Sequence, residues 1–449
     1  MEKQSTNARK PKMQHSTPAR NWVGDNGKII EPLFADYFLS LHPMRCFQGR
    51  LFTVDGMVED EAPLKKEIYE QIRYYATTSV ARRIEHIMQA IKLACASEPP
   101  KIQTDRIYVR NGTYFVDGHF SAEKEYCMNR LPIAYVSDAP APTRWLQFLI
   151  ELLYEEDIPA LQEYIGYCLL PVTKAQKMLL MVGKGGEGKS RIGLILRELF
   201  GSSMYTGSLQ KVETNRFARA DLEYKLLLVD DDMKTEALPQ TNNIKTLVTL
   251  EDKIDIERKG QQSVQGTLYV RFACFGNGSL HALYDKSNGF YRRQLLLTTK
   301  EKPVGRVDDP FLIDKMRNEK EGILLWALEG LHRLIRNNYR FTISERTAAN
   351  LKEAMEQGNN ILGFLKSEGY FEIRQGAKCK STDFYKVYER WCLDNLEKPL
   401  AASTFIHHLK DNQKSLGIVY DDKCIGTNRG FHNVDVDLFL PIDVPSPWD

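Results

Sequence analysis

Hydrophobic positions in the middle of the chain alternate between short continuous runs and runs spaced by three or four residues. Residues 178–182 are continuously apolar, which predicts a buried strand. The next apolar positions recur at helical spacing, and a glycine then supplies a helix stop: Ile192, Ile195, Leu196, Leu199 and Gly201. The alternation continues over residues 175–340 and predicts an α/β domain with a parallel sheet, ending in a long helix near 320–337.

The segment before this domain has a mixed pattern. Residues 29–138 combine a helical pattern over 67–93 with Asn111-Gly112 between two short apolar runs, which is typical of a hairpin, and so predict an α+β domain. Residues 1–28 are basic and almost free of apolar side chains, which predicts a mobile tail. A solvated leader and a DNA-binding arm are both compatible with such a tail.

Two smaller modules complete the predicted organisation. The alternating Ala-Pro run at 139–142 predicts a boundary, and residues 143–174 predict a helical module of two apolar helices. Residues 344–449 predict two helices and then a two-stranded hairpin: 381–395, 402–416, 417–424 and 431–438. That order of elements is typical of a winged helix.

Composition limits the classes of function. The chain has 449 residues, of which 43% are hydrophobic, and a formal net charge of only +2, so any nucleic-acid site must be local. The eight cysteines form no C-x-x-C pair, which argues against structural zinc and favours a reducing compartment. No run of 18 apolar residues and no secretory leader occurs. We therefore expect a cytoplasmic protein with no membrane partner.

The turn after the first predicted strand carries the strongest chemical signal. Residues 183–190, G-K-G-G-E-G-K-S, match the phosphate-loop (Walker A) pattern G-x-x-x-x-G-K-[ST] at every fixed position. Glycines let backbone N–H groups face phosphate oxygens, and the helix N-terminus adds positive potential. Lys189 would reach the β- and γ-phosphates of a nucleoside triphosphate, and Ser190 would bind Mg²⁺. The predicted nucleotide-binding residues are Gly183, Gly185, Gly186, Glu187, Gly188, Lys189, Ser190 and Arg191.

A second predicted strand, residues 225–229, ends in Asp230-Asp231-Asp232. An apolar strand that ends in carboxylates about forty residues after a phosphate loop is a Walker B pattern, in which one carboxylate holds Mg²⁺ and another orients the attacking water. We assign the metal to Asp230 and the water to Asp231. The register could differ by one residue, in which case Asp232 takes part.

Two later strands carry further candidate catalytic groups. Asn277 ends an apolar strand, and its side-chain amide is suited to sense the γ-phosphate or the attacking water. Arg292 and Arg293 precede another apolar run, and in a ring of subunits one of them could reach the γ-phosphate of a neighbour. The sequence does not say which of the two arginines would act.

A short cationic segment lies between these strands. Ile254 and Ile256 alternate with acidic residues and are followed by Arg258, Lys259 and a glycine, which predicts a hairpin with a basic tip. Such a tip can hold a phosphate backbone, although a solvated hairpin gives the same pattern.

The order of these motifs resembles that of superfamily 3 helicases, which have an AAA+-like ATPase core. Lys245 and Lys259, fourteen residues apart, resemble the lysine-bounded segment of that group. The flanks 145–149, 161–167 and 215–218 are similar to the C-terminal primase-helicase half found in phages, plasmids and integrated mobile elements. The resemblance covers about residues 105–440 and is most specific over 145–300. Glu187 departs from it, because the family often has Asn there.

The resemblance implies a replicative DNA helicase of a phage or another mobile genetic element in a bacterial host. It implies that a homo-oligomeric, hexameric ring hydrolyses ATP with Mg²⁺ on single-stranded or forked DNA. It implies that Lys189, Asp230, Asp231, Asn277 and Arg292 or Arg293 are catalytic, that Ser190 and Asp230 bind the metal, and that Lys245, Arg258 and Lys259 contact DNA. No paired metal-binding carboxylates typical of a primase precede the helical module. We therefore expect any primase or origin-binding protein to be a separate partner.

Two other classes of function compete with a helicase. An origin-binding initiator would use ATP as an assembly switch with little unwinding, and the predicted tail and winged helix are compatible with it. A P-loop kinase or a protein-remodelling ATPase is the third possibility. The segment 245–260 argues against a kinase, and the paired carboxylates with an arginine finger favour turnover over a switch.

Overall fold

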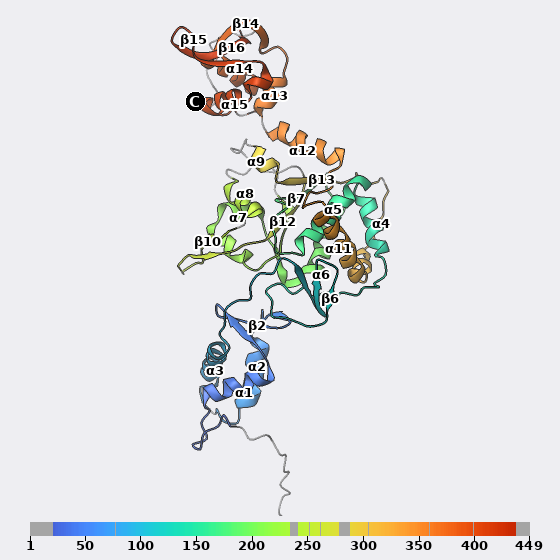
Figure 1. Cartoon of the computed structure of the whole chain (residues 1–449), viewed down its shortest axis with the longest axis vertical. Helices are drawn as coiled ribbons and strands as arrows, with labels where there is room; N and C mark the ends of the chain where they lie inside the picture. Colours follow the sequence, from blue (N-terminus) through green and yellow to red (C-terminus); the bar gives the residue numbers. More distant parts are fainter. Residues whose placement is uncertain are drawn as a thin grey trace, which may run out of the picture. The chain divides into compact units, whose positions relative to one another are not determined.

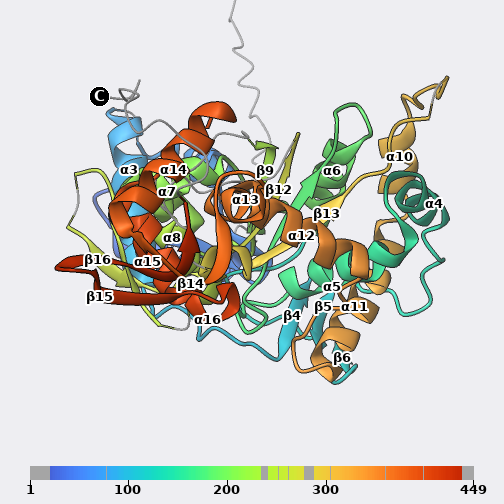
Figure 2. The same ribbon diagram turned by 90° about the horizontal axis from the view of Figure 1, so that it is seen from above.

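A computed structural model describes residues 21–76, 78–233, 241–250, 252–260, 262–277, 288–303, 305–358, 360–397 and 399–436. The chain forms two compact units (Figure 1 and Figure 2). The first runs to Ser137 and includes Gly201–Ser203; the second comprises Asp138–Phe200 and the residues from Met204 onwards.

The first unit contains a helical core and two small antiparallel sheets. Its elements are α1 (Glu31–Leu41), β1 (Arg45–Phe47), β2 (Arg50–Thr53), β3 (Gly56–Met57), α2 (Ala62–Ile72), α3 (Val80–Ala94), β4 (Arg106–Val109), β5 (Gly112–Phe115) and β6 (Phe120–Ser121). The predicted hairpin is confirmed, with Val109 opposite Gly112. Gly112 also has to be a glycine, because a Cβ there would lie 2.1 Å from the Ser121 carbonyl oxygen.

Two expectations for this unit need correction. The helical pattern over 67–93 is two helices rather than one, because the chain breaks after Ile72 and Ser79 has a φ of 53°, which a helix cannot accommodate. The folded part also begins earlier than residue 29. Trp22 is buried against Phe34 with ring centroids 4.9 Å apart, so a predicted tail could extend only over the residues before it, and residues 1–20 lie outside the described part of the chain.

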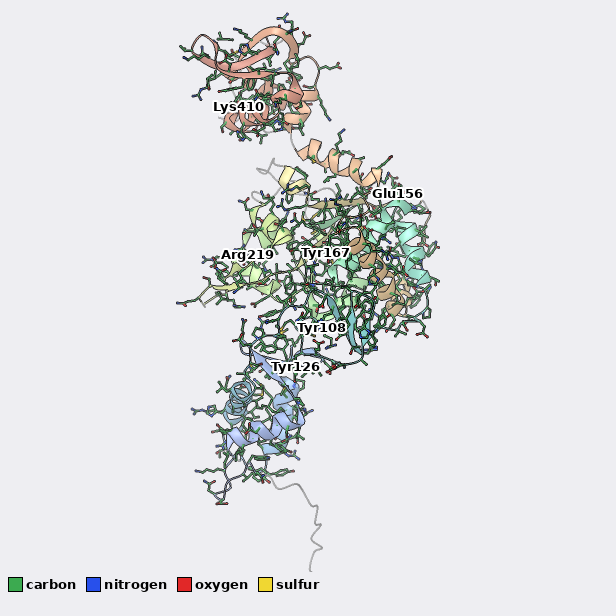
Figure 3. The ribbon with its side chains drawn as sticks, in the orientation of Figure 1. Tyr108, Tyr126, Glu156, Tyr167, Arg219 and Lys410 are labelled. Carbon is green, nitrogen blue, oxygen red and sulfur yellow. The ribbon has the colours of Figure 1, made fainter. Side chains whose placement is uncertain are left out.

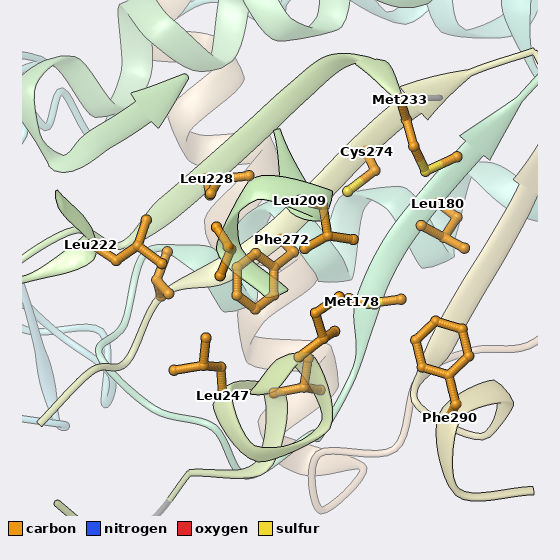
Figure 4. Close-up of a cluster of buried hydrophobic side chains, with 14 of the residues drawn as sticks. Met178, Leu180, Leu209, Leu222, Leu228, Met233, Leu247, Phe272, Cys274 and Phe290 are labelled. Carbon is orange, nitrogen blue, oxygen red and sulfur yellow. The ribbon is translucent and has the colours of Figure 1, made fainter. Parts of the chain in front are cut away.

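A five-stranded parallel sheet forms the centre of the second unit. Its spatial order is β13-β7-β12-β9-β8, and the strands are β7 (Met178–Val182), β8 (Met204–Thr206), β9 (Leu227–Met233), β12 (Arg271–Gly276) and β13 (Gln294–Thr298). The central strands are apolar on both faces, as a sheet covered by helices requires. Figure 4 shows one of the resulting apolar clusters, in which Leu228, Phe272 and Cys274 pack with residues of neighbouring helices. The predicted α/β architecture with a parallel sheet is confirmed.

Helices and a small hairpin surround this sheet. They are α4 (Thr143–Leu152), η1 (Glu155–Asp157), α5 (Ile158–Cys168), α6 (Lys189–Phe200), α7 (Leu209–Thr214), η3 (Arg216–Leu222), α8 (Asn242–Thr249), β10 (Ile254–Ile256), β11 (Val264–Gly266), α9 (Asn288–Tyr291), α10 (Leu312–Arg317), α11 (Lys320–Arg336) and α12 (Glu345–Gly358). The short 3-10 helix η2 (Gly201–Ser203) belongs to the first unit.

Helix α5 is joined to the sheet and to α11 by buried polar contacts. The Tyr164 hydroxyl donates to the Phe272 carbonyl oxygen at 2.7 Å, and the buried Glu163 carboxylate accepts from the Arg333 guanidinium at 2.7 Å. Arg271 at the start of β12 lies over the ring of Tyr167, which is labelled in Figure 3, and donates to the Val172 carbonyl oxygen at 2.7 Å. The predicted helical module is therefore packed into the same core as the sheet.

The last part of the chain has its own apolar core. Its elements are α13 (Asn360–Lys366), β14 (Glu372–Lys380), α14 (Ser381–Asp394), α15 (Ala402–Asp411), α16 (Gln413–Leu416), β15 (Val419–Ile425) and β16 (Asn428–Asp435), with sheet order β14-β16-β15. The predicted helix at 381–395 and the hairpin are present, whereas residues 437 and 438 lie outside the described part of the chain. The sequence pattern missed α13 and β14, the latter because eight of its nine residues are at least partly exposed and it lacks an apolar run. Within the described ranges, no helix is long and apolar enough to cross a membrane.

The close packing of α5 and α11 yields a stability prediction. A Cβ at Gly330 would lie 2.5 Å from the Gln162 carbonyl oxygen, so Gly330→Ala should lower the free energy of unfolding by about 1–3 kcal/mol. Gly193→Ala is the matched control, because its Cβ meets only ordinary contacts of 3.5 Å and alanine favours a helix. Urea denaturation followed by tryptophan fluorescence measures both. Equal stability of the two variants would contradict the close approach of these helices.

Candidate functional site

A glycine-rich turn, residues 183–190 (the glycine loop), joins β7 to α6. Gly185, Gly186 and Gly188 have φ values of 109°, 80° and 117°, which glycine adopts without a steric penalty. Gly183 is constrained by space instead, since a Cβ there would lie 2.2 Å from the Thr299 hydroxyl and 2.9 Å from the Lys189 ammonium. The loop sequence therefore follows from a tight, unusual backbone path between a buried strand and a helix.

Two charged side chains of the glycine loop, Glu187 and Lys189, are paired with each other. The Lys189 ammonium donates to Glu187 Oε2 at 2.8 Å, and the backbone N–H of Gly185 donates to Glu187 Oε1 at 2.7 Å. Both side chains are buried, with 8% and 3% of their surfaces exposed. Burial acts to raise the pKa of the Glu187 carboxyl, but the Lys189 ammonium and the backbone N–H groups outweigh it, so the pKa lies below its usual value. Asn277 Oδ1 also lies 3.4 Å from the Lys189 ammonium.

The three aspartates in the second half of β9, before its last residue Met233, have different surroundings. The Asp230 carboxylate is buried and accepts the backbone N–H of Leu209 at 2.8 Å, at the start of α7. Asp231 accepts a hydrogen bond from the Ser190 hydroxyl, and both Asp231 and Asp232 are exposed. Burial raises the pKa of Asp230 and of Asp231, and the Ser190 hydroxyl partly offsets the rise for Asp231.

A β-bulge explains why two neighbouring aspartates are exposed while the one before them is buried. Cys274 of β12 pairs with Asp230 and Gly276 pairs with Met233, so β9 carries one extra residue between these pairs. A bulge interrupts the alternation of side chains between the two faces of a sheet. Asp230, to which the sequence assigned the metal, accepts a backbone N–H, whereas Asp231 is the carboxylate beside Ser190.

These groups line a cavity of about 700 Å³ at the carboxyl ends of the parallel strands. The glycine loop, Asp231, Asp232 and Asn277 form one part of its wall, and Arg191 at the start of α6 lines it too. Helix α4 contributes Arg144, Phe148 and Glu151, and the segment after β13 contributes Pro303, Arg306, Val307, Asp308, Asp309 and Leu312. Carboxyl ends of strands are where open α/β sheets bind their ligands.

Sequence reasoning missed the cationic residues on the far walls of this cavity. The Arg306 guanidinium donates to the backbone carbonyl oxygen of Glu187 at 3.1 Å and pairs with Asp308 at 3.0 Å. Arg144 pairs with Glu151 at 3.4 Å. These residues lie in α4 and in a polar segment without a motif, so their only signal is their position in space.

Arg292 and Arg293 lie just before β13, at the amino ends of the parallel strands and so at the opposite end from the cavity. β13 begins at Gln294, which pairs with Met178, whereas the glycine loop follows Val182, which pairs with Thr298 at the other end. The Arg293 guanidinium donates to the carbonyl oxygen of Gly289, and Arg292 is exposed. Five residues of strand, roughly 16 Å, separate these arginines from the glycine loop of the same chain.

The predicted basic segment is also away from the cavity. β10 and β11 form the expected antiparallel hairpin, with Ile256 opposite Val264, and Figure 1 shows it extending away from the sheet. The Arg258 guanidinium pairs with the buried Glu223 carboxylate, whereas Lys259 is exposed at the turn. Lys245 lies on α8, before the hairpin.

Comparisons with known proteins concern the region just described and the whole fold. Residues 181–293, from the glycine loop to the paired arginines, match a family of unknown function (DUF5906). A solved apo structure of the NrS-1 C-terminal region (residues 305–718) is similar with a TM-score of 0.50 and 12% identity, covering 90% of this chain and 99% of that one. An A-form apo structure of the same region gives a TM-score of 0.50, 11% identity and the same coverage. No curated protein matches the sequence. The chain thus shares the fold of the NrS-1 C-terminal region.

The different surroundings of the aspartates predict different effects on stability. Asp230→Ala leaves the buried N–H of Leu209 without its acceptor and should lower the free energy of unfolding by about 1–3 kcal/mol. Asp230→Asn retains an acceptor oxygen and Asp231→Ala alters an exposed side chain, so both should change it by less than ~1 kcal/mol. Chemical denaturation of the three variants tests this order, and an equal loss for Asp231→Ala would refute it.

Proposed function

We propose that this protein is an ATP-dependent DNA helicase that works as a homo-oligomeric, hexameric ring in the replication of a phage or another mobile genetic element. The observation that carries the proposal is the glycine loop, with a buried lysine at its end and Ser190 bonded to a strand-end aspartate. The fold shared with the NrS-1 C-terminal region is compatible with this proposal.

The residues present fit a nucleoside triphosphate with Mg²⁺. The loop has positive φ values at three glycines, which turn backbone N–H groups inward, and its lysine already holds an anionic partner. No three His, Cys, Asp or Glu side chains in the described ranges come together as a metal site. A cation here therefore needs phosphate and water oxygens besides one hydroxyl and one carboxylate, as Mg²⁺ with a nucleotide usually does.

Each residue then has a role. Lys189 holds the β- and γ-phosphates, and Ser190 with Asp231 holds the cation, which screens the charge that develops on the transferred phosphoryl group. Asp232, next on the bulge, would orient the attacking water, and Asp230 would support α7 instead. Asn277, close to Lys189, serves as the sensor of the γ-phosphate.

Hydrolysis in this scheme needs a second copy of the chain. Arg292 and Arg293 lie at the amino ends of the strands, far from the glycine loop of their own chain. An arginine finger can therefore act only on a neighbouring subunit. Arg292 is the better candidate, since the Arg293 guanidinium is already bonded within its own chain. A head-to-tail contact, in which the arginine of each copy reaches the site of the next, forms a ring when the rotation between copies closes on itself.

DNA would meet the hairpin and the last part of the chain. Lys259 is exposed at the hairpin turn and can neutralise a backbone phosphate, whereas Arg258 orders the turn through Glu223. The order helix, strand, three helices and two strands from α13 to β16 supports a winged helix, with α15 as the helix that would enter a groove. That part also favours the second candidate, an origin-binding initiator that uses ATP as a switch and unwinds little.

The carboxylate assignment predicts which variant loses turnover. Asp231→Asn removes the charge beside Ser190 and should lower the ATP hydrolysis rate at least about 100-fold while nucleotide still binds. Asp230→Asn should keep most of the activity, because Asp230 bonds to backbone rather than facing the cavity. Steady-state phosphate release measures both variants. The reverse order of losses would return the metal to Asp230.

The hairpin assignment predicts an effect on DNA coupling alone. Lys259→Ala should retain basal ATP hydrolysis and lose most of its stimulation by single-stranded DNA. Lys253→Ala is the matched control, because Lys253 is exposed at the base of the same hairpin. Titration with an oligonucleotide at two salt concentrations measures the stimulation. Equal loss in both variants, or none in Lys259→Ala, would make the hairpin a solvated loop.

A further inference from the structure

The glycine loop contains a buried carboxylate at the place where a phosphate is expected. Glu187 Oε1 accepts the Gly185 N–H at 2.7 Å and Oε2 accepts the Lys189 ammonium at 2.8 Å. These two donors are of the kind that hold nucleotide phosphates in such loops. We propose that the Glu187 carboxylate is a built-in anion that occupies the phosphate position and must leave before a nucleoside triphosphate binds, an inference that rests on the proposed nucleotide site.

The Glu187–Lys189 pair packs closely against the glycine loop. An added Cβ at Gly183 would lie 2.9 Å from the Lys189 ammonium and 3.0 Å from the Glu187 carboxyl carbon, so the pair packs directly on the loop backbone. With 3% of its surface exposed, the Glu187 side chain is shielded from water that could screen its charge. A triphosphate brought to the same donors would meet a carboxylate at short range in a poorly screened environment, and like charges there repel strongly.

The cavity offers the displaced carboxylate somewhere to go. Glu187 lines the cavity, so its side chain can turn from the loop backbone toward solvent. Arg306 lines the same cavity and donates to the Glu187 carbonyl oxygen at 3.1 Å, which places a cation within reach of the same residue. Nucleotide binding is then an exchange of anions: the phosphate takes the Gly185 N–H and Lys189, and the carboxylate moves toward Arg306.

Because only molecules with an open loop can bind, the apparent affinity equals that of an open loop multiplied by the fraction of molecules in which the carboxylate has left the loop. If about one molecule in ten has Glu187 turned out, the apparent dissociation constant is raised about tenfold above that of an open loop. Glu187→Gln keeps the size of the side chain and an acceptor for Gly185, yet removes the charge and the attraction to Lys189. It therefore isolates the electrostatic part of the exchange.

The experiment measures the binding of a non-hydrolysable ATP analogue to the full-length protein by calorimetry. Glu187→Gln should bind it about tenfold more tightly than the wild type. Glu187→Ala, which removes the side chain, should do the same and should also gain binding of inorganic pyrophosphate. Glu301→Gln is the matched control, because Glu301 pairs with Lys184 of the same loop at 2.5 Å but in an exposed position, where an ion pair has little effect.

A second readout separates the inference from a general change in stability. Without nucleotide, Glu187→Gln leaves the buried Lys189 without its anionic partner and should lower the melting temperature, and saturating analogue should raise it more than in the wild type. Equal or weaker binding by Glu187→Gln, with normal binding by the wild type, would overturn the inference alone. Absence of binding by the wild type and by both Glu187 variants would instead overturn the nucleotide site itself.

Discussion

The parallel sheet of the second unit determines where everything else can lie. All five strands run in one direction, so the turns after β7, β9 and β12 all leave the sheet at the carboxyl ends of the strands. That geometry brings the glycine loop, the aspartates and Asn277 to one cavity although they are far apart in sequence. Residues that precede the strands lie at the opposite, amino ends of the strands. They include the hairpin before β12 and the paired arginines before β13.

β12 runs directly from the amino ends of the strands to their carboxyl ends. It follows the β10–β11 hairpin, begins at Arg271 and leads to Asn277 beside Lys189. Arg271 is buried and donates to carbonyl oxygens of the segment after α5, among them that of Val172, which fixes the start of the strand. If the protein is the helicase proposed above, a change at the glycine loop would reach the hairpin along this one strand, which would couple hydrolysis to DNA movement.

Much of this arrangement could be predicted from the sequence. Continuous apolar runs identified β7, β9, β12 and β13, because strands buried on both faces need no alternation. The glycine loop was predictable because its backbone demands glycine at fixed positions. The bulge in β9 was not, since no residue type marks it, and it decides whether Asp230 or Asp231 faces the cavity. The positions of Arg306 and Phe148 in the cavity wall could not be predicted either, because only tertiary packing brings their segments to the site.

The most direct test of the account is the steady-state rate of ATP hydrolysis by the wild-type protein with and without single-stranded DNA, at low and high salt. A cavity that hydrolyses ATP and is coupled to a cationic hairpin predicts a rate that DNA raises several-fold, with the increase lost as salt screens the phosphate contacts. Hydrolysis that is indifferent to DNA at both salt concentrations would contradict a translocating helicase, and a complete lack of hydrolysis would contradict the catalytic assignment as well.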